Sequence, residues 1–354
     1  MELFNTQYRL IFAFCSIVAF IIATMHDVKR VNLKSQLQWL SLFLFLLLLL
    51  FGLRGEEVGA DTNAYIFQFE NVDSLSPDRE VAFYYLTKLL HKLVSVQIFL
   101  FIIAAFYLGS LYYYIKSRPN INQFLLFFVF FSMFFFKTLG INVVRQGVSL
   151  IFFLLAYQAY EKKQLKKSVI LIIISLCWHT TTIIAIPLAY FSTRKINLKF
   201  LNISYFSSIV LAFANFGLLT ILPFLSNLNK YDRRIEVYAT QETNELYTVG
   251  FKPQFVLFNT LFLMLAYFIR KKIVSKYPVT EQKKYNSYII YFTFSSMLFF
   301  MAFQIPYSDR IGLLSWIIIP LLMEPLLAYR RHQYATLAWT ICIVLFITFE
   351  FILS

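Results

Sequence analysis

Long apolar segments separated by short polar ones constrain the fold of this chain most. Of its 354 residues 59% are hydrophobic and only 14% are charged, which lies far outside the composition of soluble globular domains. A helical membrane span needs roughly 20 apolar residues. The candidate spans are residues 8–25, 39–53, 94–115, 124–136, 143–160, 168–191, 200–225, 255–269, 288–303, 311–329 and 334–353. The sequence therefore predicts an all-α polytopic membrane protein, one integral membrane domain over residues 1–354, with about 11–12 membrane segments.

The connecting segments differ in charge, and this difference predicts on which side of the membrane each one lies. Residues 54–80 hold seven acidic and two basic residues, and residues 226–252 hold four of each. Basic residues gather instead at 29–34, 116–118, 162–167, 194–199, 270–284 and 330–331, which the positive-inside rule assigns to the cytoplasm. We therefore expect residues 54–93 and 226–252 to be the first and second outer loops. The net charge of +14 is explained by these cytoplasmic loops, and no nucleic-acid partner is expected.

Within the first outer loop, residues 80–93 have the pattern of an amphipathic helix. The apolar positions are Val81, Tyr84, Tyr85, Leu89 and Leu93. With lysines elsewhere on the turn, this pattern is typical of a helix that lies in the membrane interface.

The segment 168–191 has a basic loop on each side, so a single crossing would invert the sides of everything after it. A pair of half-helices that enters and returns to the same side restores the pattern, with its turn at residues 179–182. Such a turn is tolerated only inside protein or beside a hydrated cavity. The alternative is one ordinary helix that violates the charge rule. Segments 39–53 and 124–136 are short, about 20 Å each, which predicts recessed outer ends.

Arg145 opens one of the apolar segments. Asn142, Arg145, Gln146 and Ser149 are spaced i, i+3, i+4 and i+7, which places them on one helix face. An arginine at this depth usually faces a cavity or a partner, and its planar fork suits phosphate oxygens. The alternative is an arginine that reaches out to the lipid headgroups.

His179 is the one histidine expected at mid-membrane depth, and three threonines follow it. Histidine can act as a general acid or base near neutral pH, although a lone buried histidine is more often a helix contact. No second ligand stands at metal-binding spacing beside it, so we expect neither a metal nor another cofactor.

Two further polar groups stand at the ends of apolar segments. Arg54, Asp61, Thr62 and Tyr65 follow the second span and are interpreted as one wall of a binding site, although Asp61 could equally cap a helix that begins at Thr62. Arg310, beside Asp309, stands at a later span end, where it could simply pair with charged neighbours. We expect these groups to converge with Arg145 and His179.

This arrangement resembles the EpsG-like bacterial polysaccharide polymerases, a branch of the Wzy O-antigen and capsule polymerases. The resemblance covers residues 50–190. It rests on the Arg54 to Tyr65 group, on Asn142, Arg145 and Gln146, and on His179 followed by hydroxyl residues. Two departures are Thr181, where the family more often has serine, and Trp316, where a tyrosine often follows the late arginine.

The resemblance implies a glycosyltransferase of the bacterial inner membrane whose site faces the periplasm. It would join undecaprenyl-diphosphate-linked oligosaccharide repeat units without a nucleotide sugar or metal, alongside a flippase and a chain-length regulator. It further implies catalytic roles for His179, Asp61 and Arg145, and substrate-binding roles for Arg54, Thr62, Tyr65, Asn142, Gln146 and Arg310. The alternatives are a flippase or other transporter, an O-antigen ligase, or a membrane acyltransferase. A broken helix is also common in transporters, but no two-fold repeat of the apolar pattern is visible.

Overall fold

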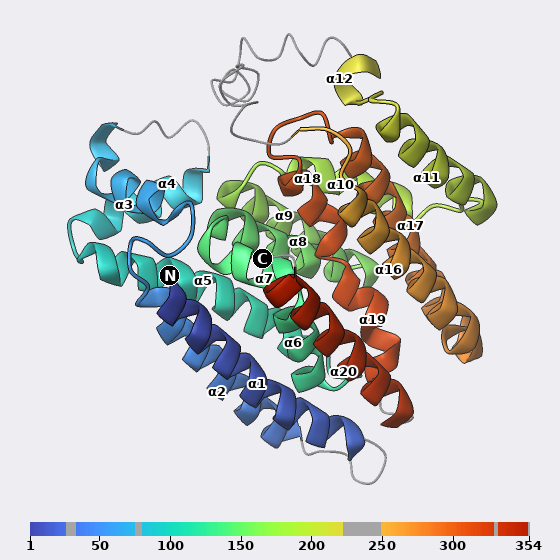
Figure 1. Ribbon diagram of the computed structural model, residues 1–354, viewed down its shortest axis with the longest axis horizontal. Helices are drawn as coiled ribbons and strands as arrows, with labels where there is room; N and C mark the ends of the chain where they lie inside the picture. Colours follow the sequence, from blue (N-terminus) through green and yellow to red (C-terminus); the bar gives the residue numbers. More distant parts are fainter. Residues whose placement is uncertain (26–32, 75–79, 222–248, 329–331, 353–354) are drawn as a thin grey trace. The chain divides into compact units, whose positions relative to one another are not determined.

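The computed structural model is helical, as Figure 1 shows. It describes residues 1–25, 33–74, 80–221, 249–328 and 332–352. Within these ranges every regular element is a helix, apart from an isolated bridge between Ile121 and Ala328. The expected all-α class is thereby confirmed.

Six helical segments in the described part of the chain are long and apolar enough to cross a membrane. They are α1 (Glu2–Thr24), α2 (Leu33–Gly52), α5 (Val96–Lys116), α16 (Pro253–Lys272), α18 (Asp309–Trp316) continued by α19 (Ile319–Leu327), and α20 (His332–Ile347). A bent pair, α6 (Gln123–Ser132) and α7 (Phe134–Ile141), raises the count to seven. The chain is therefore a multi-pass membrane protein.

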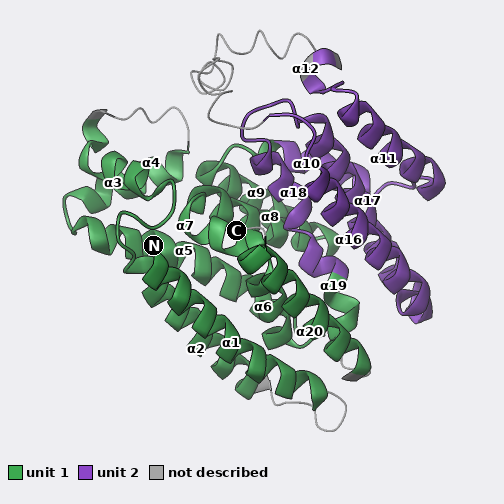
Figure 2. Ribbon diagram, in the orientation of Figure 1, with its two compact units in different colours: residues 1–183, 323–354 green, residues 184–322 purple. Residues whose placement is uncertain are grey.

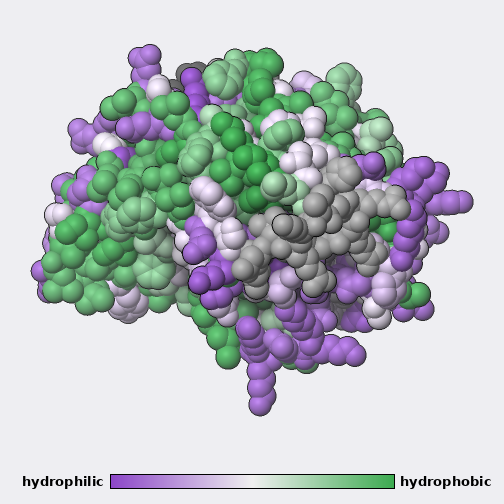
Figure 3. Space-filling view, turned by 90° about the horizontal axis from the view of Figure 1, so that it is seen from below, coloured by the Kyte–Doolittle hydropathy of each residue, from purple (hydrophilic) through white to green (hydrophobic). Residues whose placement is uncertain are grey.

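The other expected membrane segments fall on helices that are shorter or more polar than these spans. They are α8 (Val144–Glu161), α9 (Leu165–Trp178) with α10 (Thr182–Ser192), α11 (Leu198–Phe213) and α17 (Val279–Met301). Large exposed apolar side chains are common along the chain, and they spread over wide areas of the face in Figure 3. Such a surface fits contact with lipid.

The chain divides into two compact units, coloured separately in Figure 2. Unit 1 comprises residues 1–183 and 323–354, and unit 2 comprises residues 184–322. In unit 1, α1 packs against α2, α6 and α20, and α5 packs against α2 and α8. All ten residues of α6 are buried, as expected for a helix that is apolar on every side.

The α6–α7 pair corrects the expectation of one short span at residues 124–136. The two helices bend by 83° at Met133, whose backbone is extended. Gly140 and Gly147 permit close contact of α7 and α8 with Tyr107 of α5. The bend leaves Asn142 and the start of α8 beside the first outer loop.

The expectation of a short span at residues 39–53 was wrong. Helix α2 has 20 residues, about 30 Å at 1.5 Å per residue. It extends because Gln36 is accommodated in the interior, where its Oε1 accepts a hydrogen bond from the Gln123 backbone N–H at 3.0 Å.

The interruption near His179 lies where the charge pattern placed it. Helix α9 ends at Trp178, and α10 begins at Thr182. The return of this pair to one side of a bilayer stays a prediction.

The predicted first outer loop, residues 54–93, contains α3 (Thr62–Glu70), η1 (Val72–Ser74) and α4 (Val81–His91). Helix α4 buries Phe83 and Thr87, whereas Val81, Tyr85 and Leu89 of the expected apolar stripe are exposed. The exposed stripe suits the interfacial role, which remains a prediction. Most of the second outer loop, 226–252, lies outside the described residues.

In unit 2, α17 packs against α11, α16 and α18. A buried amide joins three of these helices. Asn259 Nδ2 donates to Ser296 Oγ at 2.9 Å and to Ser315 Oγ at 3.2 Å, and its Oδ1 accepts from Trp316 Nε1 at 3.0 Å. Satisfied polar contacts of this kind fix how apolar helices pack.

Candidate functional site

Arg54 is a buried cation at the end of α2. Only 2% of the residue is exposed. Its Nε donates to Thr62 Oγ1 at 3.0 Å, and its Nη1 donates to the Phe51 carbonyl at 2.6 Å. No carboxylate in the described part of the chain lies within 4.0 Å of this guanidinium. Burial lowers the pKa of Arg54 to about 10, because a low-dielectric surrounding disfavours the charged form.

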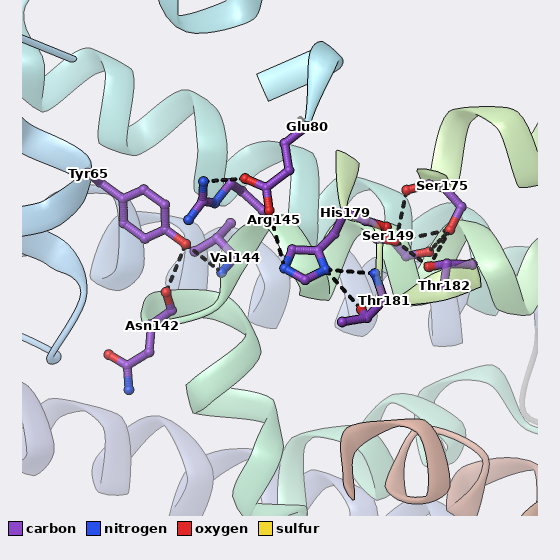
Figure 4. Close-up of polar contacts among 10 residues, drawn as sticks. All are labelled: Tyr65, Glu80, Asn142, Val144, Arg145, Ser149, Ser175, His179, Thr181 and Thr182. Carbon is purple, nitrogen blue, oxygen red and sulfur yellow. Dashed lines mark hydrogen bonds and ion pairs between the residues drawn. The ribbon is translucent and has the colours of Figure 1, made fainter. Parts of the chain in front are cut away.

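Tyr65 joins α3 to the start of α8. Its hydroxyl donates to the Asn142 carbonyl at 2.8 Å and accepts from the Val144 N–H at 3.0 Å (Figure 4). Val144 is the first residue of α8, and the N-cap residue Val143 makes no side-chain capping bond. Tyr65 therefore satisfies a backbone donor that the helix leaves open. Burial raises the pKa of Tyr65.

Arg145 lies against two aromatic rings and one carboxylate. Its guanidinium carbon is 5.5 Å from the Tyr65 ring centroid and 5.0 Å from that of Phe83, both within cation–π range. Its Nη1 pairs with Glu80 Oε2. Only 19% of its side chain is exposed. These inward contacts are not those of an arginine that reaches out to lipid headgroups.

Glu80 connects Arg145 to His179, and sequence reasoning missed it. Its Oε1 lies 3.3 Å from His179 Nε2, so one carboxylate faces both groups (Figure 4). The residue is 4% exposed. It is the N-cap residue of α4 and has a left-handed backbone conformation with φ 56°. This conformation is uncommon outside glycine and persists only where surrounding contacts stabilise it. The signal in the sequence was an acidic residue directly before an amphipathic helix.

His179 has contacts on both ring nitrogens. Its Nδ1 accepts from the Thr181 N–H at 3.2 Å and lies 2.9 Å from Thr181 Oγ1. A backbone N–H can only donate, so Nδ1 is the acceptor and the proton of the neutral ring is on Nε2, facing Glu80.

Hydroxyl groups hold the break between α9 and α10 against α8. Ser149 Oγ lies 2.5 Å from Thr182 Oγ1 and donates to the Ser175 carbonyl at 2.8 Å, and Ser175 Oγ donates back to the Ser149 carbonyl at 2.7 Å. These contacts fix the position of His179 relative to Arg145.

The structure modifies the expected polar stripe. Asn142 is the C-cap of α7 and precedes α8, so it does not share the α8 face with the other three. It meets Tyr65 through its carbonyl, and its side chain lies beside Gly59. Gln146 is fully buried in α8. Arg145 and Ser149 reach the two sides of the His179 turn, as Figure 4 shows.

Asp61 stands at the N-cap of α3 but makes no side-chain capping bond. Its charge acts on Tyr65 and on Arg145, so it belongs to the neighbourhood of the site. Arg310 lies in unit 2, with its guanidinium carbon 4.9 Å from the Tyr307 ring centroid. Its convergence with the unit 1 residues stays a prediction.

The family model of EpsG matches residues 37–354. The chain belongs to the EpsG family. This is a family of membrane proteins linked to exopolysaccharide synthesis, and the match includes every residue of the candidate site. No curated protein and no solved structure matches the chain. The resemblance inferred from the sequence is confirmed at the level of the family.

Proposed function

We propose that this EpsG protein is a polysaccharide polymerase. It joins undecaprenyl-diphosphate-linked oligosaccharide repeat units on the periplasmic side of the bacterial inner membrane. Membership of a family linked to exopolysaccharide synthesis supports the pathway, and the chemistry of the site supports glycosyl transfer from a lipid diphosphate.

The observation that carries the proposal is a pair of buried arginines at α3. Arg54 donates to Thr62 of α3 at 3.0 Å, and the Arg145 guanidinium carbon lies 5.5 Å from the ring centroid of Tyr65 on the same helix. Arg54 has no carboxylate within 4.0 Å among the described residues. A buried cation is costly unless a charge compensates it. A diphosphate supplies that charge to Arg54 and can compete with Glu80 for Arg145.

Glycosyl transfer from a lipid diphosphate needs two kinds of group. Negative charge develops on the leaving diphosphate, and guanidinium donors in a water-poor site stabilise it strongly. We assign this role to Arg145, with Arg54 and Arg310 as further donors. The attacking sugar hydroxyl needs a proton acceptor or an orienting group, which the region of His179 and Asp61 supplies.

The remaining site residues would position these groups. The Tyr65 hydroxyl forms hydrogen bonds with backbone atoms of Asn142 and Val144, between α7 and α8. The Thr62 hydroxyl accepts a hydrogen bond from Arg54. Asn142 and Gln146 flank Arg145 in sequence and are candidates for sugar contacts. We propose as partners a flippase that supplies the repeat units and a chain-length regulator, as the family resemblance implies.

A surface-polysaccharide gel tests the proposal in cells. Cells that lack the gene are complemented with wild type, with Arg145→Ala or with the control Arg194→Ala, which removes an exposed arginine that contacts Tyr190. Wild type and Arg194→Ala should restore a ladder of chain lengths. Arg145→Ala, at equal membrane abundance, should give single repeat units.

The other functions predict different gels. Loss of even the single-unit band in the deletion strain would indicate a flippase or ligase, and an unchanged ladder would refute polymerisation. A normal ladder with Arg145→Ala would remove Arg145 from the site.

A further inference from the structure

We propose that Glu80 is the general base of this site and that His179 holds it in position. The inference rests on the proposed function, because it assigns the proton acceptor of glycosyl transfer. It departs from the sequence-based expectation, in which His179 or Asp61 had that role.

The hydrogen bonds of His179 argue against a basic role for the ring. The backbone N–H of Thr181 occupies the Nδ1 lone pair at 3.2 Å. The other nitrogen then carries the proton and faces Glu80 Oε1 at 3.3 Å. A neutral imidazole in this arrangement has no lone pair left for a sugar hydroxyl. Its protonated nitrogen lies against Glu80 Oε1, and this contact orients the carboxylate.

Glu80 has the placement that a base in this reaction needs. Its two oxygens face Arg145 and His179, so it lies beside the group assigned to the leaving diphosphate. The residue is 4% exposed, and its left-handed backbone fixes where the side chain starts. A carboxylate held in a water-poor site next to the reacting groups is a common general base.

Asp61 is the less suitable carboxylate. It stands at the N-cap of α3, and its charge acts on Arg145 and Tyr65. Glu80 is the carboxylate that contacts both Arg145 and His179.

The proposed step balances as follows. The acceptor hydroxyl oxygen forms a bond to the anomeric carbon of the donor glycan, and the bond from that carbon to the diphosphate oxygen breaks. The electron pair leaves with the undecaprenyl diphosphate, whose charge Arg145 stabilises. The hydroxyl proton passes to a Glu80 oxygen. Diphosphate binding at Arg145 replaces the Arg145–Glu80 pair and so releases a carboxylate oxygen to receive this proton.

The test uses the full-length protein reconstituted in vesicles with a lipid-diphosphate-linked repeat unit. Glu80→Gln keeps the size of the side chain and one acceptor oxygen, loses the acceptor for the second of the two donors, and removes the base. It should lower kcat by about 10²- to 10⁴-fold, the usual contribution of general base catalysis, with little change in KM. Glu80→Asp keeps the carboxylate and should retain more activity than Glu80→Gln.

Chemical rescue separates a base from a structural residue. Glu80→Ala should recover turnover when formate is added, because formate supplies a carboxylate in the vacated space. His179→Gln should lose activity by a smaller factor and should not respond to formate. Activity of Glu80→Gln at the wild-type rate, or no rescue of Glu80→Ala by formate, would overturn the inference.

A matched control comes from another carboxylate of unit 1, whose side chain is 12% exposed. Glu324 pairs with Arg118, which follows the C-terminal end of α5. The site lies near the other end of this helix, where Gln97 contacts Gly52, close to Arg54. Helix α5 has 21 residues, about 30 Å at 1.5 Å per residue. Glu324→Gln should therefore keep the wild-type kcat. Failure of the wild-type protein itself to elongate chains would refute the proposed function. Active Glu80→Gln beside active wild type would refute only the assignment of the base.

Discussion

Removal of one hydroxyl, in Tyr65→Phe, tests how α3 is attached to the start of α8. The Tyr65 hydroxyl donates to the Asn142 carbonyl at 2.8 Å and accepts from the Val144 N–H at 3.0 Å. Phenylalanine keeps the ring beside Arg145 but makes neither bond. The substitution therefore isolates the hydrogen bonds from the packing.

The expected loss of stability follows from the two hydrogen bonds that the substitution removes. A typical hydrogen bond contributes about 1 kcal/mol net, and a buried donor without a partner costs about 1–3 kcal/mol. Val144 is 1% exposed, so water does not readily replace the hydroxyl at its N–H. We expect Tyr65→Phe to lower the free energy of unfolding by about 2–3 kcal/mol.

The assay is denaturant-induced unfolding of the purified protein in detergent micelles, read by tryptophan fluorescence. Tyr85→Phe is the control, because Tyr85 lies on the neighbouring helix α4 with 59% exposure and should change stability by no more than about 0.5 kcal/mol. Equal stability of Tyr65→Phe, Tyr85→Phe and wild type would refute the attachment of α3 to α8 through this hydroxyl.

Three further substitutions test other parts of the fold by the same unfolding assay. Gly59→Ala should cost at least about 1–2 kcal/mol, because Gly59 has φ +84° and a Cβ there meets Asn142; a neutral result would contradict that backbone. Glu324→Met should cost about 3–5 kcal/mol by leaving Arg118 buried without its partner, and adding Arg118→Met should recover most of the loss; no recovery would argue against the ion pair. Asn259→Leu should cost about 2–3 kcal/mol, because Trp316 Nε1 loses its acceptor, and a stabilised protein would contradict the network.

Composition and charge were sufficient for the class of the protein and for one local feature. Apolar segments of this length leave helices as the way to satisfy backbone groups in lipid. The basic loops on both sides of residues 168–191 placed an interruption at His179, and α9 ends one residue before it. The sides of the membrane on which these loops lie stay a prediction from the positive-inside rule.

The bend at Met133 could not be predicted, because no proline or glycine interrupts the phenylalanine-rich run around it. The span at α2 was predicted too short for a similar reason. The expected span began at residue 39, but the helix continues back past Gln36, whose side chain accepts from the Gln123 N–H in the interior. Both features depend on contacts between distant segments, which periodicity does not record.

The candidate site was predictable only in part. Arg54, Thr62, Tyr65, Asn142 and Arg145 come together around α3, as the polar residues at segment ends suggested. Glu80 was missed because its partners are 65 and 99 residues away, and its position directly before an amphipathic helix does not indicate those partners.

The central claim is that Arg145 binds the diphosphate that leaves when two repeat units are joined. The most direct measurement follows chain length and released undecaprenyl diphosphate together, using purified protein in vesicles that contain only the lipid-linked repeat unit. The account predicts longer chains from wild type, with one lipid diphosphate released for each new linkage, and neither product from folded Arg145→Ala. Elongation by Arg145→Ala at the wild-type rate, or movement of the repeat unit across the vesicle membrane without any new linkage by wild type, would contradict it.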